Sequence, residues 1–354
     1  MLAEGLPMQI LFRFLCCVLA LAAGAALAQD AELYEGEVVV PNQSDAARAE
    51  ALPSALAAAL VRLTGRADVE EDPAVTPELA QAQNLLRQFR YRQDLDPAQP
   101  GSAQTVLVAR FDRDGVDALL ALAGQRIWPS PRPVPVVWLA IDDGRGPRLL
   151  GSAQSRVVSA LTRRAAERGL RLSYPLLDLE EQQIAVAPFW AGDSAAARRA
   201  SARYQSRVSL VGKLYRSASG WTAEWALYDG EQRLGDTTRS APDAPSVLAE
   251  GADLAADLLS SRATVAVADA GPPGRFPVSI AGIASAEDYA RTLAYLGRLS
   301  VVRGTRVLGA EEDRLLLELD LRSGLSGLRQ LVANGQTLTA EDEDPAEGRF
   351  RLLP

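Results

Sequence analysis

The pair Asp142 and Asp143 is the first feature of this sequence that could do chemistry. Both carboxylates directly follow the apolar run 136–141, and the ends of such strands are where α/β proteins place functional groups. A carboxylate pair can ligate a metal ion, but no third ligand stands near it in the sequence. The following Gly144 favours the simpler interpretation, an Asp-Gly turn that ends the strand.

A second acidic group consists of Asp178, Glu180 and Glu181, with Asp193 nearby. Paired acids of this kind carry out general acid–base catalysis in glycosidases. Acids also gather at helix N-termini, where they interact with the helix dipole in solvent. We favour the second interpretation for this group.

Arg132 is the third polar candidate, because it lies between Pro131 and Pro133 and close to Trp128. A guanidinium on such a stiff backbone could clamp a carboxylate or stack on the indole. It could equally brace two domains against each other, and we favour the brace.

Trp221 and Trp225 are four residues apart in an expected strand, so they share one face of a sheet. They could form a stacking platform for a sugar or a base. Packing in the core beside Trp138 is the favoured interpretation.

The composition excludes several classes of enzyme. The chain has no histidine, Lys213 is its one lysine, and both cysteines, Cys16 and Cys17, lie in the N-terminal apolar segment. Ser-His-Asp triads, zinc sites built on His or Cys, and a Cys nucleophile are therefore excluded in the mature chain. We expect no metal and no cofactor. The net charge of −8 disfavours nucleic acid as a partner.

The N-terminus predicts export. Arg13 precedes the apolar segment 14–27, and Ala26-Leu27-Ala28 is a small-x-small cleavage pattern, so residues 1–28 are expected to be a signal peptide cleaved after Ala28. The alternative is an uncleaved membrane anchor, for which the segment is short. No later segment of the sequence is apolar enough to span a membrane.

The elements that would carry these residues suggest three small domains of α/β and α+β class. The first, 29–127, is expected to contain strand 33–40, helix 46–63, helix 77–89, strand 105–111 and helix 112–123. Four prolines at 129, 131, 133 and 135 then form a stiff, extended connector.

The second domain, 128–267, is expected to hold a mixed sheet with flanking helices. Its first strand, 136–141, is a continuous apolar run that predicts burial on both faces. The elements expected after it are helix 153–168 with Val157 inward and Arg168 outward, strand 170–174, one or two helices in 175–204, strands 208–216, 221–228 and 231–239, and helix 248–259.

The third domain, 276–340, follows a Gly-Pro linker and is expected to be ferredoxin-like. Its β-α-β-β-α-β order comes from strand 276–283, helix 286–296, strands 299–309 and 314–321, helix 326–333 and a last short strand at 336–339. Residues 341–354 form an acidic tail that we expect to be loose.

Several of these segments together resemble the DUF2066 family of exported Gram-negative bacterial proteins. The resemblance rests on Tyr34-Glu-Gly-Glu-Val-Val-Val40, Leu63-Thr-Gly65, Phe111-Asp112 and Trp128-Pro-x-Pro-Arg-Pro with Val137-Trp-Leu-Ala-Ile-Asp-Asp-Gly144. It implies a periplasmic location and supplies no catalytic residues. In architecture alone, the middle domain, with Val211-Gly-Lys-Leu before a Trp-rich hairpin, is similar to protein-binding domains of the TolB and curli-secretion type.

These observations predict a non-catalytic periplasmic protein that binds another envelope protein, as an adaptor or assembly factor. One alternative is a carboxylate-only hydrolase of cell-wall glycan, with Asp142, Asp143 and Glu180 as its first candidates. The other is a small-ligand-binding protein that uses Trp221 and Trp225, with Arg132 at the mouth of an apolar pocket.

Overall fold

The computed structural model describes residues 32–95, 102–154, 157–218, 220–263, 271–299, 301–311, 313–322, 324–333, 337–341 and 348–353. The expected signal peptide lies outside these residues. The described residues contain one three-stranded sheet and two five-stranded mixed sheets with helices, which confirms the expected α/β and α+β class. They divide into two compact units, and each is described below by itself.

The first unit contains Gly36–Phe111 and Arg132–Thr264. Its three-stranded sheet has the order β1 (Glu35–Val40), β3 (Ala103–Phe111) and β2 (Leu86–Leu95). The long helix α2 (Asp45–Thr64) begins at Ser44, whose hydroxyl accepts from the Ala47 amide, and ends at Gly65 with φ 73°. At Gly36 a Cβ would lie 1.7 Å from the carbonyl oxygen of Ala55, so β1 can approach α2 only with glycine there.

The helix expected at 77–89 is wrong. The chain forms the single turns α3 (Thr76–Leu79) and α4 (Ala82–Leu85) beside the 3₁₀ turn η1 (Val69–Glu71), and then the ten-residue strand β2. Phe89 and Tyr91 stand two residues apart, a strand period, and β2 pairs with β3 along its whole length. Thr76 followed by Pro77 is a helix-start signal, because threonine can cap a helix and proline suits the first helical position. From Leu86 onward, however, the hydrogen bonds to β3 determine the conformation.

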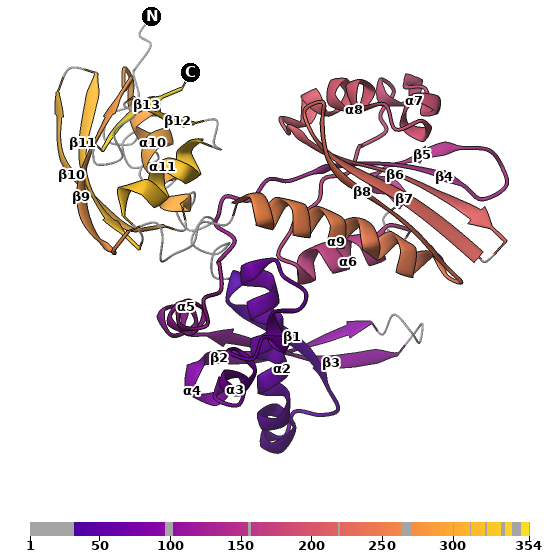
Figure 1. The fold of residues 1–354 in the computed structure, drawn as a ribbon, viewed down its shortest axis with the longest axis horizontal. Coiled ribbons are helices and arrows are strands. Elements are labelled where there is room, and N and C mark those ends of the chain that lie inside the picture. The colour runs from indigo at the N-terminus through magenta and orange to yellow at the C-terminus, as the bar shows by residue number, and fades with distance from the viewer. Residues whose placement is uncertain are drawn as a thin grey trace, which may run out of the picture. The chain divides into compact units, whose positions relative to one another are not determined.

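The five-stranded middle sheet has the order β5-β4-β6-β7-β8, and only the pair of β4 and β6 is parallel. Strand β4 (Val136–Asp142) is buried from Val136 to Ile141, as the sequence predicted. Helices α6 and α9 cover one face, and α7 and α8 cover the other (Figure 1). The bounds are β5 Arg148–Leu150, β6 Val208–Ser217, β7 Gly220–Asp229, β8 Gln232–Ala241, α6 Ser159–Glu167, α7 Val186–Trp190, α8 Ser194–Ser201 and α9 Ala244–Ala263.

Two elements expected around this sheet differ in the structure. The helix expected to begin at Ala153 begins at Ser159, after the 3₁₀ turn η2 (Ser152–Gln154), and Val157 is 40% exposed instead of buried. The strand expected at 170–174 is reduced to one bridge between Ser173 and Val136. Strand β5 (Arg148–Leu150) already pairs with Leu139–Ile141 of β4, so this segment meets only the beginning of β4.

The second unit contains Asp112–Pro131, Val265–Pro354 and the described residues up to Glu35. Its sheet has the order β10-β11-β9-β13-β12. The order β9-α10-β10-β11-α11-β12 is the expected ferredoxin-like one, with β13 inserted between β9 and β12. The bounds are α5 Arg113–Leu122, β9 Gly274–Ala281, α10 Ala286–Arg298, β10 Val302–Glu311, β11 Arg314–Leu321, α11 Leu325–Ala333, β12 Leu338–Ala340 and β13 Arg349–Leu352.

The expectation of a loose C-terminal tail is wrong for 349–352. Strand β13 pairs in parallel with β9, and Phe350 is 1% exposed within a leucine-rich core. Its alternation of Arg349 and Arg351 with Phe350 and Leu352 is a strand pattern, and the acidic composition of the residues before it obscured that pattern.

A polar cluster ties the N-terminal residues of this unit to its C-terminal part. The Tyr34 hydroxyl donates to Oδ1 of Asp117 at 2.7 Å, and Arg322 donates to Oδ2 of the same carboxylate at 2.7 Å. The Arg113 guanidinium lies 5.2 Å from the centre of the Tyr34 ring. The ion pair between Asp117 and Arg322 is therefore extended by a hydrogen bond from Tyr34.

The division into the domains 29–127, 128–267 and 276–340 stays a prediction. Among the described residues, no helix combines the length and the apolar character needed to cross a membrane.

Candidate functional site

Arg132 forms its hydrogen bonds within the first unit. Its guanidinium donates to the carbonyl oxygens of Arg62 at 2.8 Å, Leu63 at 3.1 Å and Gly169 at 2.8 Å. The first two belong to the last turn of α2, where carbonyl oxygens have no donor within the helix and a cation complements the helix dipole. Arg132 therefore braces the end of α2 against the segment that follows α6, within one compact unit. Arg132 lines neither of the pockets described below.

Arg168 supplies a second brace that the sequence did not reveal. The helical period of α6 predicted an outward side chain, but Arg168 is 1% exposed. It donates to the Gly65 carbonyl oxygen and forms ion pairs with Asp253 and Asp257 of α9. Burial was not foreseeable because the two carboxylates come from a helix far along the sequence, and a buried guanidinium needs such partners.

Asp142 and Asp143 form a turn, as the favoured interpretation predicted. Oδ1 of Asp142 accepts from the backbone amides of Gly144 at 2.8 Å and Gly146 at 3.1 Å. Asp143 pairs with Arg148 at 3.0 Å, and this hydrogen-bonded guanidinium lowers the pKa of the Asp143 carboxyl. Both carboxylates are thus committed to local structure.

The tryptophans lie on opposite faces of the middle sheet. Trp138 stacks on Phe189 with ring centres 4.9 Å apart, and its Nε1 donates to the Ser201 hydroxyl, so it packs under α7 and α8. Trp225 is 2% exposed and donates to the Val247 carbonyl oxygen of α9. The expectation that Trp225 packs beside Trp138 is therefore wrong, because alternate residues of a strand point to opposite faces and the two strands present these residues to different helices.

Trp128 and Pro133, two further residues of the Trp–Arg-Pro block, lie in or beside the proline connector. Trp128 is 1% exposed and Pro133 is half-buried. Residues 125–135 contain neither helix nor strand, but the chain bends at Ser130 and Pro131, so the connector is not extended throughout as expected. Trp221, the other aromatic candidate, is half-buried, and the Arg216 guanidinium lies 4.5 Å from its ring centre.

The second acidic group surrounds one arginine. Arg203 donates to both carboxylate oxygens of Asp178, at 3.2 and 2.8 Å, and it lies 3.4 Å from Glu181 and 3.8 Å from Glu180. Hydrogen bonding from Arg203 lowers the pKa of Asp178, and the same contact raises the pKa of Arg203. The fourth acid, Asp193, caps the N-terminus of α8 through the amides of Ala195 and Ala196.

Glu181 is the buried member of this group, with 2% exposure. Its carboxylate accepts from the Tyr204 hydroxyl at 2.5 Å and from the Leu177 amide at 2.7 Å. Partial burial and the hydrogen bond to Glu181 both raise the pKa of Tyr204. The Tyr204 ring packs edge-on against Trp138, so the acidic group is fixed to the sheet core.

An open pocket of 360 Å³ begins at this acidic group and runs between α7 and α8. We call it the α7–α8 pocket. Its apolar lining consists of Ile184, Ala185, Pro188, Phe189, Ala196 and Ala200. Its charged lining consists of Glu180, Glu181, Arg199 and Arg203.

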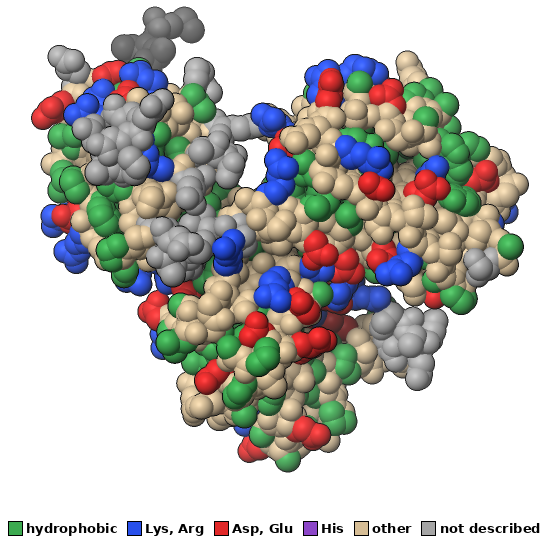
Figure 2. All heavy atoms as spheres, in the orientation of Figure 1, with side chains coloured by type: hydrophobic (Ala, Val, Ile, Leu, Met, Phe, Trp, Pro, Cys, Tyr) green, Lys and Arg blue, Asp and Glu red, His purple; other side chains and the backbone are tan. Residues whose placement is uncertain are grey.

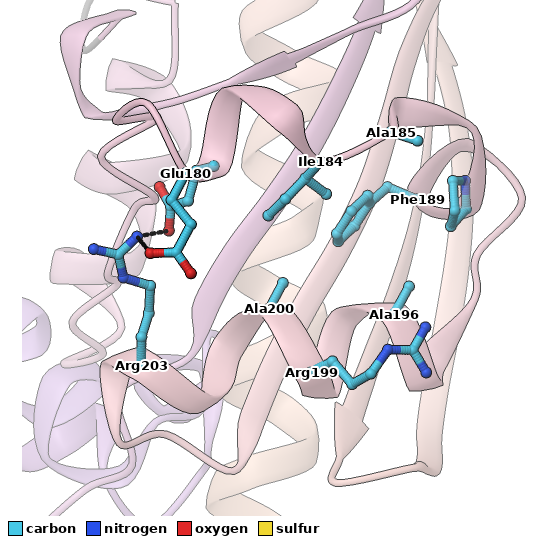
Figure 3. A pocket seen from close by; sticks show the side chains of 10 residues that line it. Glu180, Ile184, Ala185, Phe189, Ala196, Arg199, Ala200 and Arg203 are labelled. Atoms are coloured by element: carbon cyan, nitrogen blue, oxygen red, sulfur yellow. Dashed lines mark ion pairs between the residues drawn. The ribbon is translucent and has the colours of Figure 1, made fainter.

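Figure 3 shows how these side chains are arranged. Ile184 and Phe189 lie between the ion pairs of Arg203 at one end and the Arg199 guanidinium at the other. Arg199 is exposed, and its side chain forms no hydrogen bond or ion pair with any residue that the structure describes. The pocket is therefore apolar in the middle and carries charge at both ends.

Exposed leucines lie next to this pocket. Leu176 is 59% exposed and Leu179 is 81% exposed, and both belong to the loop that leads into Glu180. The loop is held in place by the Leu176 amide, which donates to the Tyr204 hydroxyl, and by the Leu177 amide, which donates to Oε2 of Glu181. The leucines therefore sit on an ordered loop beside the pocket.

A second, more polar pocket of 200 Å³ shares Phe189 and contains Lys213 and Glu224. Lys213 Nζ lies 2.9 Å from Oε2 of Glu224, and Tyr215 donates to Oε1 of Glu224 at 2.9 Å. Burial raises the pKa of Glu224, but the hydrogen bonds from Lys213 and Tyr215 outweigh it, so this pKa lies below its ordinary value. The charges of this pocket are paired with each other.

The rest of the surface offers less. No group of three metal-ligating side chains occurs among the residues that the structure describes. On the face drawn in Figure 2, acidic and basic side chains are interspersed. That face shows no broad basic area of the kind that binds nucleic acid.

The residues of the α7–α8 pocket were not all visible in the sequence. Glu180 and Glu181 were candidates, whereas Arg199, Arg203 and Phe189 were not. One usable signal was the run from Phe189 to Asp193, in which Gly192 ends one helix and Asp193 caps the next. Such a tight corner places the aromatic residue beside the following helix.

Comparison with known proteins corrects the family resemblance. Residues 28–129 match the family described as Domain of unknown function (DUF8605), and the resemblance to DUF2066 is wrong. The match includes three of the segments quoted for the resemblance, 34–40, 63–65 and 111–112, whereas most of the Trp–Arg-Pro–Trp block, which begins at Trp128, lies beyond it. No curated protein matches the chain.

The chain is also similar to a solved structure, the crystal structure of TolB from Acinetobacter baumannii, at 15% identity and a TM-score of 0.20. The similarity covers 44% of this chain and 35% of TolB, so the chain spans about a third of the length of that protein. A likeness of this size carries no argument about function.

Proposed function

We propose that this protein is a non-catalytic periplasmic adaptor or assembly factor that binds another protein of the cell envelope through the α7–α8 pocket. The periplasmic location rests on the signal-like residues 1–28. The binding role rests on one observation, an open pocket with an apolar lining beside exposed leucines.

Covering exposed apolar side chains contributes favourably to the association of two proteins. Leu176 and Leu179 are held by an ordered loop, so covering them loses little conformational freedom. Protein interfaces characteristically combine such apolar anchors with a central pocket and a charged rim. The α7–α8 pocket has all three parts.

The same geometry disfavours the hydrolase alternative. Glu180 and Glu181 pair with the same guanidinium instead of facing each other across the pocket. Glycosidases need two acids on opposite sides of the scissile bond, about 5–9.5 Å apart. Asp142 and Asp143 are held in a turn, as described above.

The proposal is tested by site-specific photocrosslinking in the cells that make the protein. A photoreactive phenylalanine analogue at position 179 should give a discrete crosslinked species, and the same analogue at Leu122, which is 90% exposed in the other unit, should not. The substitution Ala200→Phe fills the pocket and should abolish the species. Ala166→Phe adds the same side chain to an exposed position of α6 outside the pocket lining and should leave it intact. Two results would overturn the proposal. One is that no crosslinked species is specific to position 179, and the other is that such a species forms equally well in the Ala200→Phe variant.

A further inference from the structure

We infer that the α7–α8 pocket selects a peptide segment whose large apolar side chain is flanked by a basic residue on one side and an acidic residue on the other. This inference rests on the proposed function and names the chemistry of the partner. It follows from how charge is distributed along the pocket.

One end of the pocket is negative. Asp178, Glu180 and Glu181 place three carboxylates around the single guanidinium of Arg203. Glu180 is the accessible member, because its side chain is 87% exposed and its contact with Arg203 is long, 3.8 Å. A cationic side chain of a partner can therefore pair with Glu180 without displacing the bidentate contact between Arg203 and Asp178.

The other end is positive. Arg199 points along α8 away from the Arg203 group (Figure 3), and no described residue neutralises it. Its neighbour Arg198 differs, since it pairs with Glu231 at 2.8 Å and does not line the pocket. An incoming carboxylate therefore finds one unengaged guanidinium at this end.

The middle of the pocket takes the apolar side chain. Ile184, Phe189 and Ala200 belong to or pack against the cluster that contains Trp138, so this floor is firm. A volume of 360 Å³ holds one large side chain with part of the backbone on either side. Opposite charges at the two ends then fix the direction in which the segment lies, which is how electrostatic complementarity contributes to specificity.

The probes are short acetylated and amidated peptides with the order Lys, Leu, Asp separated by Ser or Gly. Three control peptides differ from this one by a single replacement, of Lys by Gln, of Asp by Asn, or of Leu by Ser. The readout is the methyl NMR signal of Ile184, with Ile280, buried in the C-terminal sheet of the other unit, as the internal reference.

We expect the Lys-Leu-Asp peptide to shift the Ile184 signal in a saturable way and to leave Ile280 unchanged. Each neutralised peptide should bind about threefold more weakly at low salt, and the difference should shrink as salt is added. The Ser peptide should not bind. The Arg199→Glu variant should bind the Lys-Leu-Asp peptide about tenfold more weakly, and it should regain affinity for a further peptide in which Lys replaces Asp. Arg198→Glu should change the affinity for the Lys-Leu-Asp peptide by less than about twofold.

Three results would overturn the inference. They are equal affinity for the charged and the neutral peptides, equal effects of Arg199→Glu and Arg198→Glu, and no saturable shift of Ile184 with any peptide. Both variants change exposed arginines, and their thermal unfolding checks that they fold. The crosslink at position 179 is measured independently, so the docking role can stand when the charge selectivity fails.

Discussion

The hydroxyl of Tyr204 donates to Oε1 of the buried Glu181 at 2.5 Å. The same hydroxyl oxygen accepts from the backbone amide of Leu176 and so holds the loop of that residue. One phenol thus connects the acidic end of the α7–α8 pocket to the loop that presents the exposed leucines. The aromatic ring of the same residue rests on Trp138. Pocket, loop and sheet core meet at this side chain.

Removing that hydroxyl should destabilise the first unit. In Tyr204→Phe the ring packing remains, but a buried carboxylate loses a donor, which costs on the order of 1–3 kcal/mol. Urea unfolding followed by tryptophan fluorescence measures the change. Tyr174→Phe, which removes an exposed hydroxyl contact with Thr162, is the matched control and should cost less. Equal losses in the two variants would contradict the bracing role of Tyr204.

Replacing Arg132 by lysine should also be costly despite the retained charge. Arg132 reaches three carbonyl oxygens with a planar fork, and an ammonium group cannot match that geometry. We expect a loss of about 2 kcal/mol in the free energy of unfolding. Arg207→Lys, at an exposed pair with Asp229, should change it by less than about 0.5 kcal/mol. A tolerated Arg132→Lys would argue against the fork as the stabilising feature.

A matched pair of glycine substitutions tests the contact between β1 and α2. Gly36→Ala places a Cβ 1.7 Å from a backbone oxygen, so the strand and the helix must separate, at a cost of several kcal/mol, about 3 or more. Gly297→Ala meets no atom within 4 Å in the exposed part of α10 and should stabilise by up to about 1 kcal/mol. Thermal melting of the two variants should therefore shift in opposite directions. A neutral Gly36→Ala would show that the strand can move away from α2 at little cost.

The carboxyl of Asp117 should make the second unit more stable in mild acid. Burial raises its pKa above the ordinary 3.8, although the hydrogen bond from Tyr34 and the charge of Arg322 oppose this. Between the ordinary and the raised pKa, the folded state keeps a proton that the unfolded state has lost. This contribution to stability therefore falls as pH rises through that window.

Asp117→Asn removes that titration. The free energy of unfolding of the parent protein minus that of the variant should decrease as pH rises above the ordinary pKa of 3.8, as measured by urea unfolding at a series of pH values. Asp143→Asn serves as a control of opposite sign, because Arg148 lowers the pKa of this half-buried carboxyl, and its difference should not decrease as pH rises. A difference that grows with pH would mean that the ion pair with Arg322 outweighs the burial of the carboxyl.

The predictable parts of the fold are those encoded within one segment. The continuous apolar run at Val136–Ile141 has no solvent face to present, so its burial followed from composition alone. Ser44 and Gly65 bound α2 close to the ends of the helix expected at 46–63, because the side-chain and backbone requirements of a helix cap are local. The strand and helix order of the C-terminal sheet was visible for the same reason.

The parts that escaped prediction depend on partners far away in the chain. Strand β2 exists because β3 offers it a ladder, and Arg168 is buried because α9 brings Asp253 and Asp257 to it. In the α7–α8 pocket, the acids were visible in the sequence. Arg199 looked like any other surface cation, because its lack of a partner is a fact of three-dimensional neighbours.

The single lysine described above has a practical consequence for anyone mapping the contacts of this protein. Lys213 lies against Glu224, and every other basic side chain is an arginine. Crosslinking surveys that use amine-reactive reagents have a single lysine side chain to react with in this sequence. Surveys of that kind would pass over its neighbours, and reagents directed at carboxylates or guanidinium groups would find them.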